Sequence, residues 1–116
     1  MALIKRGEIW LVNLEPARGQ EIRKSRPCVV VSAEQYGILQ LRIVVPITEW
    51  KPAFSKSFWH VRIEPDKFNN LKKISAIDCL QIRAVDTQRF EKKIGAVNAQ
   101  QMDDIVAAIT ILINSP

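Results

Sequence analysis

Short strand-like segments follow one another closely along most of this chain, separated by proline, glycine or charged residues. They lie at residues 7–16, 27–33, 41–48, 57–65, 73–85 and 92–97. The second, PCVVVSA, is a continuous apolar run of the kind that is buried on both faces of a sheet. Short strands at this spacing are typical of a compact β-barrel or sandwich, so the sequence predicts a mainly β fold.

Three of the segments carry further local signals. Pro46 lies near the end of the third segment, which predicts an edge strand or a bulge there, because proline cannot donate a ladder hydrogen bond. In the fourth segment, strict alternation favours a core position for Trp59. The fifth segment, 73–85, is long enough for two strands across a bend.

The hydrophobic pattern changes to a helical period after Asn98. Asn98 can cap a helix, and Gln101 three residues later suits the partner position of a capping box. The expected apolar face consists of Met102, Ile105, Val106, Ile109, Leu112 and Ile113. A C-terminal helix packed on the strands makes the predicted class α+β, with short helical turns expected from Asp86 and after Ser32.

Length and charge limit the domain organisation and the choice of partners. A chain of 116 residues is expected to form a single domain, residues 1–116, around one core. The net charge is +5, and cations concentrate in residues 18–26 and 51–73. Clustered loop cations attract polyanions, but a merely solvated surface would show the same pattern, so charge alone does not decide between them.

The sequence favours a cytoplasmic protein without a membrane segment. Strand-like sequence begins at once, which leaves no room for a signal peptide. The most apolar stretch, 105–113, is about half of the ~20 residues that a bilayer span requires. Cys28 and Cys79 lie in apolar surroundings without metal-ligand spacing, so we expect small buried hydrophobic residues rather than a disulfide.

Metal or cofactor chemistry has little support in the sequence. His60 is the single histidine, and the acidic residues form no cluster of ligands. Gly-rich phosphate loops and dinucleotide fingerprints are absent from the sequence. We therefore expect no cofactor and no metal, and an enzyme of this composition would work with arginines, hydroxyls and carboxylates.

A mostly basic run, GQEIRKSR, directly precedes the apolar strand segment. Pro27 favours an extended backbone at Arg26, so this arginine is presented at the end of a rigid strand, where it can bind a phosphate through two parallel hydrogen bonds. An ion pair of Arg26 with Glu21 or Asp78 is the alternative. Thr48, at the end of another strand, could donate its hydroxyl to the same phosphate.

Three blocks of the chain resemble the MazF/PemK family of toxin ribonucleases. RGEIWLVNLEPARGQEIRKSRPCVVVS shares with the family a Gly-Glu-Ile strand, an Asn-Leu-x-Pro turn, a Gly-x-Glu and an Arg-Pro before a valine-rich strand. VVPIT resembles the second block of the family, and ISAIDCLQIRAVDTQRF with the later IGAV resembles the third. The resemblance covers nearly the whole chain, in order.

The resemblance implies an SH3-like small β-barrel that forms a homodimer and cuts single-stranded RNA without a metal. In the family, a 2′-hydroxyl attacks the adjacent phosphate and leaves a 2′,3′-cyclic phosphate and a 5′-hydroxyl. Carried onto matching positions, the catalytic pair is Arg26 and Thr48. Glu21 would support the site by orienting Arg26 or accepting a proton. Ser75, Gln81 and Arg83 would support it or touch bases, although Gln81 could simply close a hydrogen bond within the fold.

One position departs from the family. Some members carry an acidic residue immediately before the matching glutamine, whereas this chain has Leu80. Asp78 is the candidate replacement, because alternate positions on a strand share a face. Asp78 is therefore included among the supporting residues.

The segment TEWKPAFSKSFW interleaves cations with aromatic residues. Aromatic side chains can stack on unpaired bases while cations follow the RNA backbone. Trp50, Lys51, Phe54 and Lys56 are therefore candidate RNA contacts. The candidates on the earlier basic run are Arg23 and Lys24.

The expected partners are single-stranded RNA, a second copy of the chain, and an antitoxin whose acidic flexible tail would occupy the site that RNA uses. Two other functions stay open. One is a binding module of the same fold that poisons gyrase, and the other is an RNA-binding regulator without activity.

Overall fold

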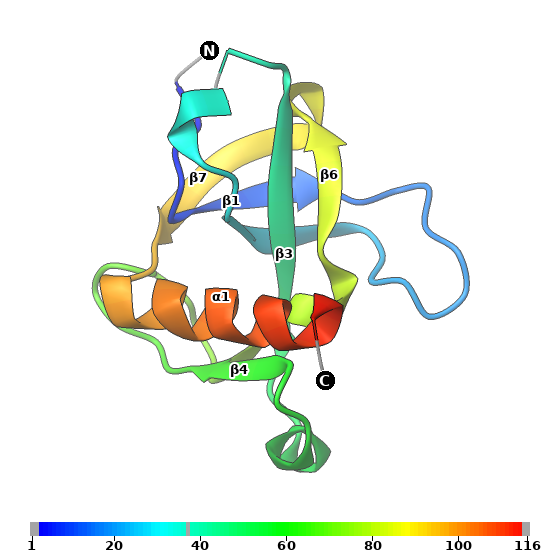
Figure 1. Ribbon diagram of the computed structural model, residues 1–116, viewed down its shortest axis with the longest axis vertical. Helices are drawn as coiled ribbons and strands as arrows, with labels where there is room; N and C mark the ends of the chain where they lie inside the picture. The colour runs from blue at the N-terminus through cyan, green and yellow to red at the C-terminus, as the bar shows by residue number, and fades with distance from the viewer. Residues whose placement is uncertain (1–2, 37, 115–116) are drawn as a thin grey trace.

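The computed structural model describes residues 3–36 and 38–114, in which antiparallel strands form one curved sheet and a C-terminal helix lies across it (Figure 1). The strands are β1 (Glu8–Asn13), β2 (Ser25–Val30), β3 (Leu41–Glu49), β4 (His60–Ile63), β5 (Ser75–Asp78), β6 (Arg83–Asp86) and β7 (Phe90–Ala96). The helix is α1 (Ala99–Ile113), and four 3-10 turns complete the fold: η1 (Glu34–Tyr36), η2 (Pro52–Lys56), η3 (Cys79–Gln81) and η4 (Thr87–Arg89). The turns expected from Asp86 and after Ser32 are confirmed as η4 and η1.

The sheet is organised around β3. The strand order is β4-β5-β3-β2-β1-β7, and β6 also pairs with β3. The prediction of an edge or bulge at Pro46 was wrong, because β3 is central and Pro46 pairs with Cys28 of β2. Residues 41–44 of β3 pair with β6 and residues 47–49 pair with β5, so the proline falls where the partner changes. The missing N–H therefore interrupts neither of these two ladders.

The α+β class is confirmed, but the word barrel is too strong. In the part of the chain that the structure describes, β7 pairs only with β1, so hydrogen bonding does not close the sheet. Side chains fill the space inside its curve instead. Phe90 of β7 and Val85 of β6 lie in one buried cluster with Trp10, Val12, Cys28, Val30 and Val44.

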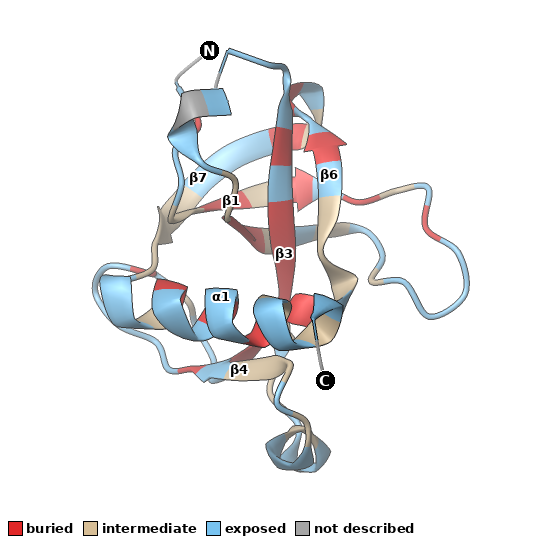
Figure 2. Cartoon of the chain, in the orientation of Figure 1, coloured by how far each residue is buried: buried red, intermediate tan, exposed pale blue. Residues whose placement is uncertain are grey.

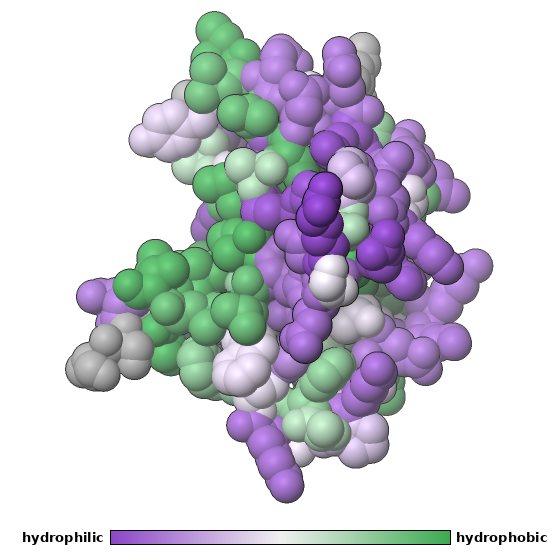
Figure 3. Space-filling model, turned by 90° about the vertical axis from the view of Figure 1, so that its right-hand side faces the viewer, coloured by the Kyte–Doolittle hydropathy of each residue, from purple (hydrophilic) through white to green (hydrophobic). Residues whose placement is uncertain are grey.

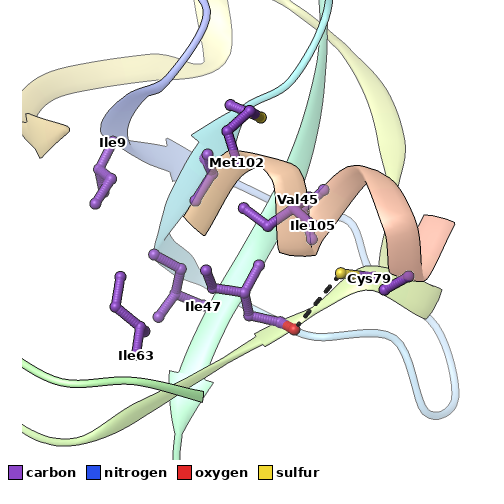
Figure 4. Packing of buried hydrophobic residues seen from close by; sticks show 10 residues of the cluster. Ile9, Val45, Ile47, Ile63, Cys79, Met102 and Ile105 are labelled. Carbon is purple, nitrogen blue, oxygen red and sulfur yellow. Dashed lines mark hydrogen bonds between the residues drawn. The ribbon is translucent and has the colours of Figure 1, made fainter. Parts of the chain in front are cut away.

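A second buried cluster lies between the sheet and α1 (Figures 2 and 4). It contains Ile9, Val29, Val45, Ile47, Ile63, Ile77, Cys79, Met102, Ile105 and Ala108. Cys28 and Val30 point into the first cluster and Val29 into the second, which confirms that this strand is buried on both faces. Trp59 packs against the second cluster, as its alternation predicts.

The helix begins as predicted, but its buried face is narrower than predicted. Asn98 accepts from the backbone N–H of Gln101 at 2.7 Å, and the Gln101 side chain accepts from the backbone N–H of Asn98 at 2.8 Å. Val106 and Ile113, expected on the packed face, are 40% and 79% exposed. Ala108 is buried instead and belongs to the second cluster.

Both cysteines are buried and unpaired, as expected. Burial raises the pKa of Cys28 to about 12, although Arg83 opposes the shift, and burial with the nearby Asp78 raises the pKa of Cys79 to about 12. These thiols stay protonated at neutral pH. Among the described helices, α1 included, we find none with the length and apolar character of a membrane span.

Candidate functional site

Arg26 and Thr48 lie on neighbouring antiparallel strands. Cys28 of β2 pairs with Pro46 of β3, and continuing this register by two residues sets Arg26 opposite Thr48. Alternate positions on a strand share a face, so the pairing brings both side chains to the same side of the sheet. Both residues line one groove together with Ser75, as the predicted site requires.

The groove has a volume of about 600 Å³ and is strongly basic. Pro27 and Ile47 are among its apolar lining residues, Thr48 and Ser75 supply hydroxyls, and Glu49 supplies a carboxylate. The cations that line it are Arg26, Lys72, Lys73, Lys92 and Lys93. Lys72 and Lys73 fall within the basic stretch 51–73, but the sequence did not assign them to the site, and it missed Lys92 and Lys93 altogether. Two Lys-Lys pairs beside strand segments were the available signal.

The polar groups of the pair Arg26 and Thr48 are free for a ligand. Nε of Arg26 donates to the backbone oxygen of Arg23 at 3.1 Å, which leaves its terminal nitrogens available. Within the described residues, no carboxylate lies at ion-pair distance from Arg26, so the alternative of a pair with Glu21 or Asp78 was wrong. The hydroxyl of Thr48 has no hydrogen bond to any described residue.

Ser75 is less free. Its hydroxyl donates to the backbone oxygen of Lys73 at 2.8 Å, and the residue is buried. Ser75 therefore orders the wall of the groove, with its hydroxyl oxygen still able to accept.

Glu21, Gln81 and Arg83 lie in a neighbouring groove of about 520 Å³ and not in the groove of Arg26. Gln81 accepts from the backbone N–H of Ile22 and donates to the backbone oxygen of Gln20, both at 2.9 Å. Arg83 donates to the backbone oxygen of Leu14 at 3.2 Å. These two side chains hold the loop between β1 and β2 in place. For Gln81, the alternative of a hydrogen bond within the fold is therefore the one that the structure has.

The 14–24 loop, between β1 and β2, is also organised by Glu15, which the sequence missed. Its carboxylate accepts from the backbone N–H groups of Lys24 at 2.8 Å and Ala17 at 3.1 Å. These hydrogen bonds, with a smaller contribution from Arg23, lower the pKa of Glu15. Glu21 accepts from the backbone N–H of Arg18 at 2.6 Å, so it orders the loop and does not orient Arg26.

Arg23 and Lys24 are exposed on this loop, where the sequence predicts RNA contacts. The loop projects toward the viewer in Figure 3, and most of that face is hydrophilic. Apolar side chains gather along one edge of the same view. The cations of the 14–24 loop are therefore accessible to a polyanion.

Asp78 does not take the place of the acid missing at position 80. The expectation that Asp78 and Leu80 share a face was wrong, because β5 ends at Asp78 and η3 breaks the alternation. Leu80 is 58% exposed, whereas Asp78 is buried with its Oδ2 3.4 Å from Nε2 of His60. The other carboxylate oxygen of Asp78 is buried without a hydrogen-bond partner among the described residues.

Stacking and edge-on contacts between side-chain rings hold the 50–57 loop, which lies between β3 and β4. Phe54 stacks on His60 with centroids 3.8 Å apart, and Trp50 meets Phe54 edge-on at 5.8 Å. The Ser57 hydroxyl contacts Nδ1 of His60. One face of Phe54 is therefore covered, and the half-buried Trp50 lies 5.9 Å from the guanidinium of Arg62. Only the cations, Lys51 and Lys56, are fully exposed among the RNA contacts predicted here.

In the described ranges, 3–36 and 38–114, no group of three or more histidine, cysteine or acidic side chains is arranged to hold a metal ion. The groove offers a guanidinium, ammonium groups and hydroxyls, together with the carboxylate of Glu49. The guanidinium, the ammonium groups and the hydroxyls are groups that bind and stabilise a phosphate by hydrogen bonding and charge.

The sequence comparisons identify relatives that all belong to one family. A sequence model of the PemK-like, MazF-like toxin of type II toxin-antitoxin system matches residues 5–113. The chain is 30% identical over 115 residues to Endoribonuclease MazF9 of Mycobacterium tuberculosis, covering 94% of this chain and 95% of that protein. It is 28% identical over 109 residues to Endoribonuclease MazF of Staphylococcus saprophyticus, covering 94% and 90%.

Solved structures share the fold. MazF from Deinococcus radiodurans matches with a TM-score of 0.80 at 17% identity and covers 97% of this chain and 98% of its own. A mycobacterial endoribonuclease in complex with its cognate antitoxin matches with a TM-score of 0.75 at 16% identity, covering 97% of each chain. At these identities the structures establish the common fold.

Proposed function

Because the chain belongs to the PemK-like, MazF-like toxin family of type II toxin–antitoxin systems, we propose that it is a sequence-specific endoribonuclease that cuts single-stranded RNA. It acts as one domain, residues 1–116, in the cytoplasm, and by cutting messenger RNA it arrests translation and growth. The observation that carries the proposal is the basic groove in which Arg26 and Thr48 face one another with free donors.

The reaction that suits this groove needs no metal. The 2′-oxygen of one nucleotide attacks the adjacent phosphorus, and its proton leaves as the new P–O bond forms. The bond from phosphorus to the 5′-oxygen breaks, and that oxygen gains a proton. The products are a 2′,3′-cyclic phosphate and a 5′-hydroxyl, and no oxidant, reductant or water is consumed.

Arg26 and Thr48 stabilise the charge that develops on the phosphoryl oxygens. The terminal nitrogens of Arg26 donate to these oxygens as a fork, and the hydroxyl of Thr48 donates one further hydrogen bond. A guanidinium carries five donors and no acceptor, so it is a very poor base. Its main contribution is therefore stabilisation of the transition-state charge.

An antitoxin is the second partner. A flexible acidic segment complements the cations of the groove and of the 14–24 loop, and would exclude RNA by occupying the same charges. The relative in complex with its cognate antitoxin supports a partner of this kind.

A homodimer is the third association. Leu41 and Ile43 share a face of β3 with Val45 and Ile47, which α1 covers, yet both are exposed beyond the helix. On α1, Val106 and Ile113 lie seven residues apart on one face of the helix and are also exposed. Exposed apolar residues of this kind suit the buried part of an isologous dimer interface. A constant monomer mass in sedimentation at micromolar concentration would contradict it.

The test is cleavage of a long single-stranded RNA in EDTA by the purified protein and by R26A and T48V variants. Discrete cuts with cyclic-phosphate ends are expected, and each variant should lose about 10²–10³-fold in rate. Gln100→Ala, at an exposed position in the first turn of α1 away from the groove and the proposed dimer surface, is the control and should cut normally. Intact RNA at high protein concentration would sink the proposal and favour a gyrase-binding or RNA-binding module.

A further inference from the structure

The groove of Arg26 has a second wall that the catalytic pair does not use. Lys72 and Lys73 lie at the end of the loop between β4 and β5, and Lys92 and Lys93 lie on β7. The two pairs are far apart in the sequence but line the same groove.

The loop that carries Lys72 is stiffened from within by Asn69, which is fully buried. Its Oδ1 accepts from the backbone N–H groups of Asp66 at 3.0 Å and Leu71 at 2.9 Å. Its Nδ2 donates to the backbone oxygen of Glu64 at 2.9 Å. A buried amide with all these partners fixes the course of the loop.

The same loop is docked tightly on β7. The side chain of Asn70 donates to the backbone oxygen of Ile94 at 2.8 Å, and the N–H of Ala96 donates to the backbone oxygen of Phe68 at 3.0 Å. At Gly95 an added Cβ would lie 2.4 Å from that Phe68 oxygen, so only glycine permits this approach. The spacing between the two lysine pairs is therefore set by backbone contacts.

The four lysines differ in whether an acid neutralises them. Nζ of Lys93 lies 2.9 Å from Glu8, and Nζ of Lys73 lies 3.9 Å from Glu49. Partial burial raises the pKa of Glu8, but hydrogen bonds from Lys5, Trp10 and Lys93 outweigh it and lower the pKa, so this pair stays charged. In the described chain Lys72 and Lys92 have no such partner within 4.0 Å.

We propose that Lys72 and Lys92 bind consecutive phosphates of the RNA strand beside the scissile phosphate at Arg26, as a track that guides the strand along the groove. The proposal rests on the proposed function and adds the path of the substrate. Two ammonium groups without an acidic partner line the groove that contains Arg26, and a strand with a negative charge at every nucleotide can pair with both of them.

The experiment compares K72Q/K92Q with K5Q/K67Q, which removes the same net charge at exposed positions outside the groove. The probe is a mixed-sequence single-stranded RNA with 2′-O-methyl riboses, which cannot be cut by 2′-oxygen attack. Its dissociation constant is measured by fluorescence anisotropy across a range of KCl concentrations. Circular dichroism confirms that each variant is folded.

Each phosphate contact to a single strand contributes about 0.7 to the slope of log affinity against log salt, so K72Q/K92Q should be shallower by about 1.4. K5Q/K67Q should keep the wild-type slope. On unmodified RNA, K72Q/K92Q should raise KM and leave kcat nearly unchanged, because the lysines bind the strand and do not touch the reacting atoms.

Equal slopes in the two double variants would overturn the proposal. Weakened binding of polyglutamate, with unchanged RNA binding, would also overturn it and assign the groove to an acidic peptide. Cleavage of unmodified RNA by the wild-type protein is scored separately, so failure of the proposed function and failure of the lysine track give different results.

Discussion

The 14–24 loop and the 50–57 loop were both expected to contact RNA, but different forces hold them. Side chains from other elements fix the first by hydrogen bonds to its backbone, as Gln81 does at Ile22 and Gln20. The second is fixed by a stack of rings, with Phe54 on His60. The first therefore depends on polar geometry and the second on apolar contact.

This difference teaches how to separate holding residues from contacting residues. The side chains of Gln81, from η3, and Glu15 form hydrogen bonds with the backbone of the 14–24 loop. The cations Arg23 and Lys24 of this loop face solvent. In the 50–57 loop the rings are partly covered and Lys51 is exposed. In both loops, the residues that fix the backbone and the residues available to a ligand are different ones.

The largest loss of stability is expected from removing the imidazole of His60, on which Phe54 of the 50–57 loop stacks. His60→Ala leaves the buried carboxylate of Asp78 without its remaining partner and Phe54 without its stack, and should lower the free energy of unfolding by about 3 kcal/mol. Urea unfolding measures the loss. His60→Gln keeps hydrogen bonding without the ring, so a loss equal to that of His60→Ala would assign the stability to stacking alone.

A smaller effect is expected at the fastening of the 14–24 loop. Gln81→Ala removes the hydrogen bonds to the half-buried N–H of Ile22 and to the exposed oxygen of Gln20, which should cost about 1 kcal/mol. Hydrogen exchange at the Ile22 amide should accelerate, while the amides of the 50–57 loop stay unchanged. Gln81→Glu keeps the acceptor for Ile22 and should protect that amide. Equal acceleration in both loops would mean that they are not held independently.

The smallest effect is the pH response of the 14–24 loop. The backbone N–H groups of Lys24 and Ala17 hold the pKa of Glu15 below its ordinary value of 4.5. The ionised carboxylate therefore stabilises the loop fully above 4.5, and this contribution is lost as the pH falls through the lowered pKa. The Lys24 amide resonance should follow this titration in the wild type and be flat in Glu15→Gln. A midpoint above 4.5 would contradict the assignment.

The sequence was sufficient where local chemistry decides the structure. The capping box of α1, the doubly buried β2 and the extended backbone at Arg26 depend on residues within a few positions of one another. Pro46 was misplaced because its tolerance depends on which strands pair with β3 on either side of it. That information lies in the tertiary arrangement and not in the flanking residues.

The candidate site also contains residues that the local sequence predicts and residues that only the tertiary arrangement brings there. Arg26, Thr48 and Ser75 came from motif blocks, and the fold brings all three to one groove. Lys92 could not be placed there in advance, because its position depends on the docking of β7 against a loop that begins near residue 64. Asp78 failed as a supporting acid because a turn replaced the strand on which the alternation argument relied.

Thr48 belongs to the strand at the centre of the sheet. β3 pairs with β2, β5 and β6, and its side chains enter both buried clusters. Local opening of either half of the molecule must therefore disturb the backbone that carries the Thr48 hydroxyl. A partly unfolded toxin that still cuts RNA is not expected, and catalytic activity should disappear on heating in step with the whole fold.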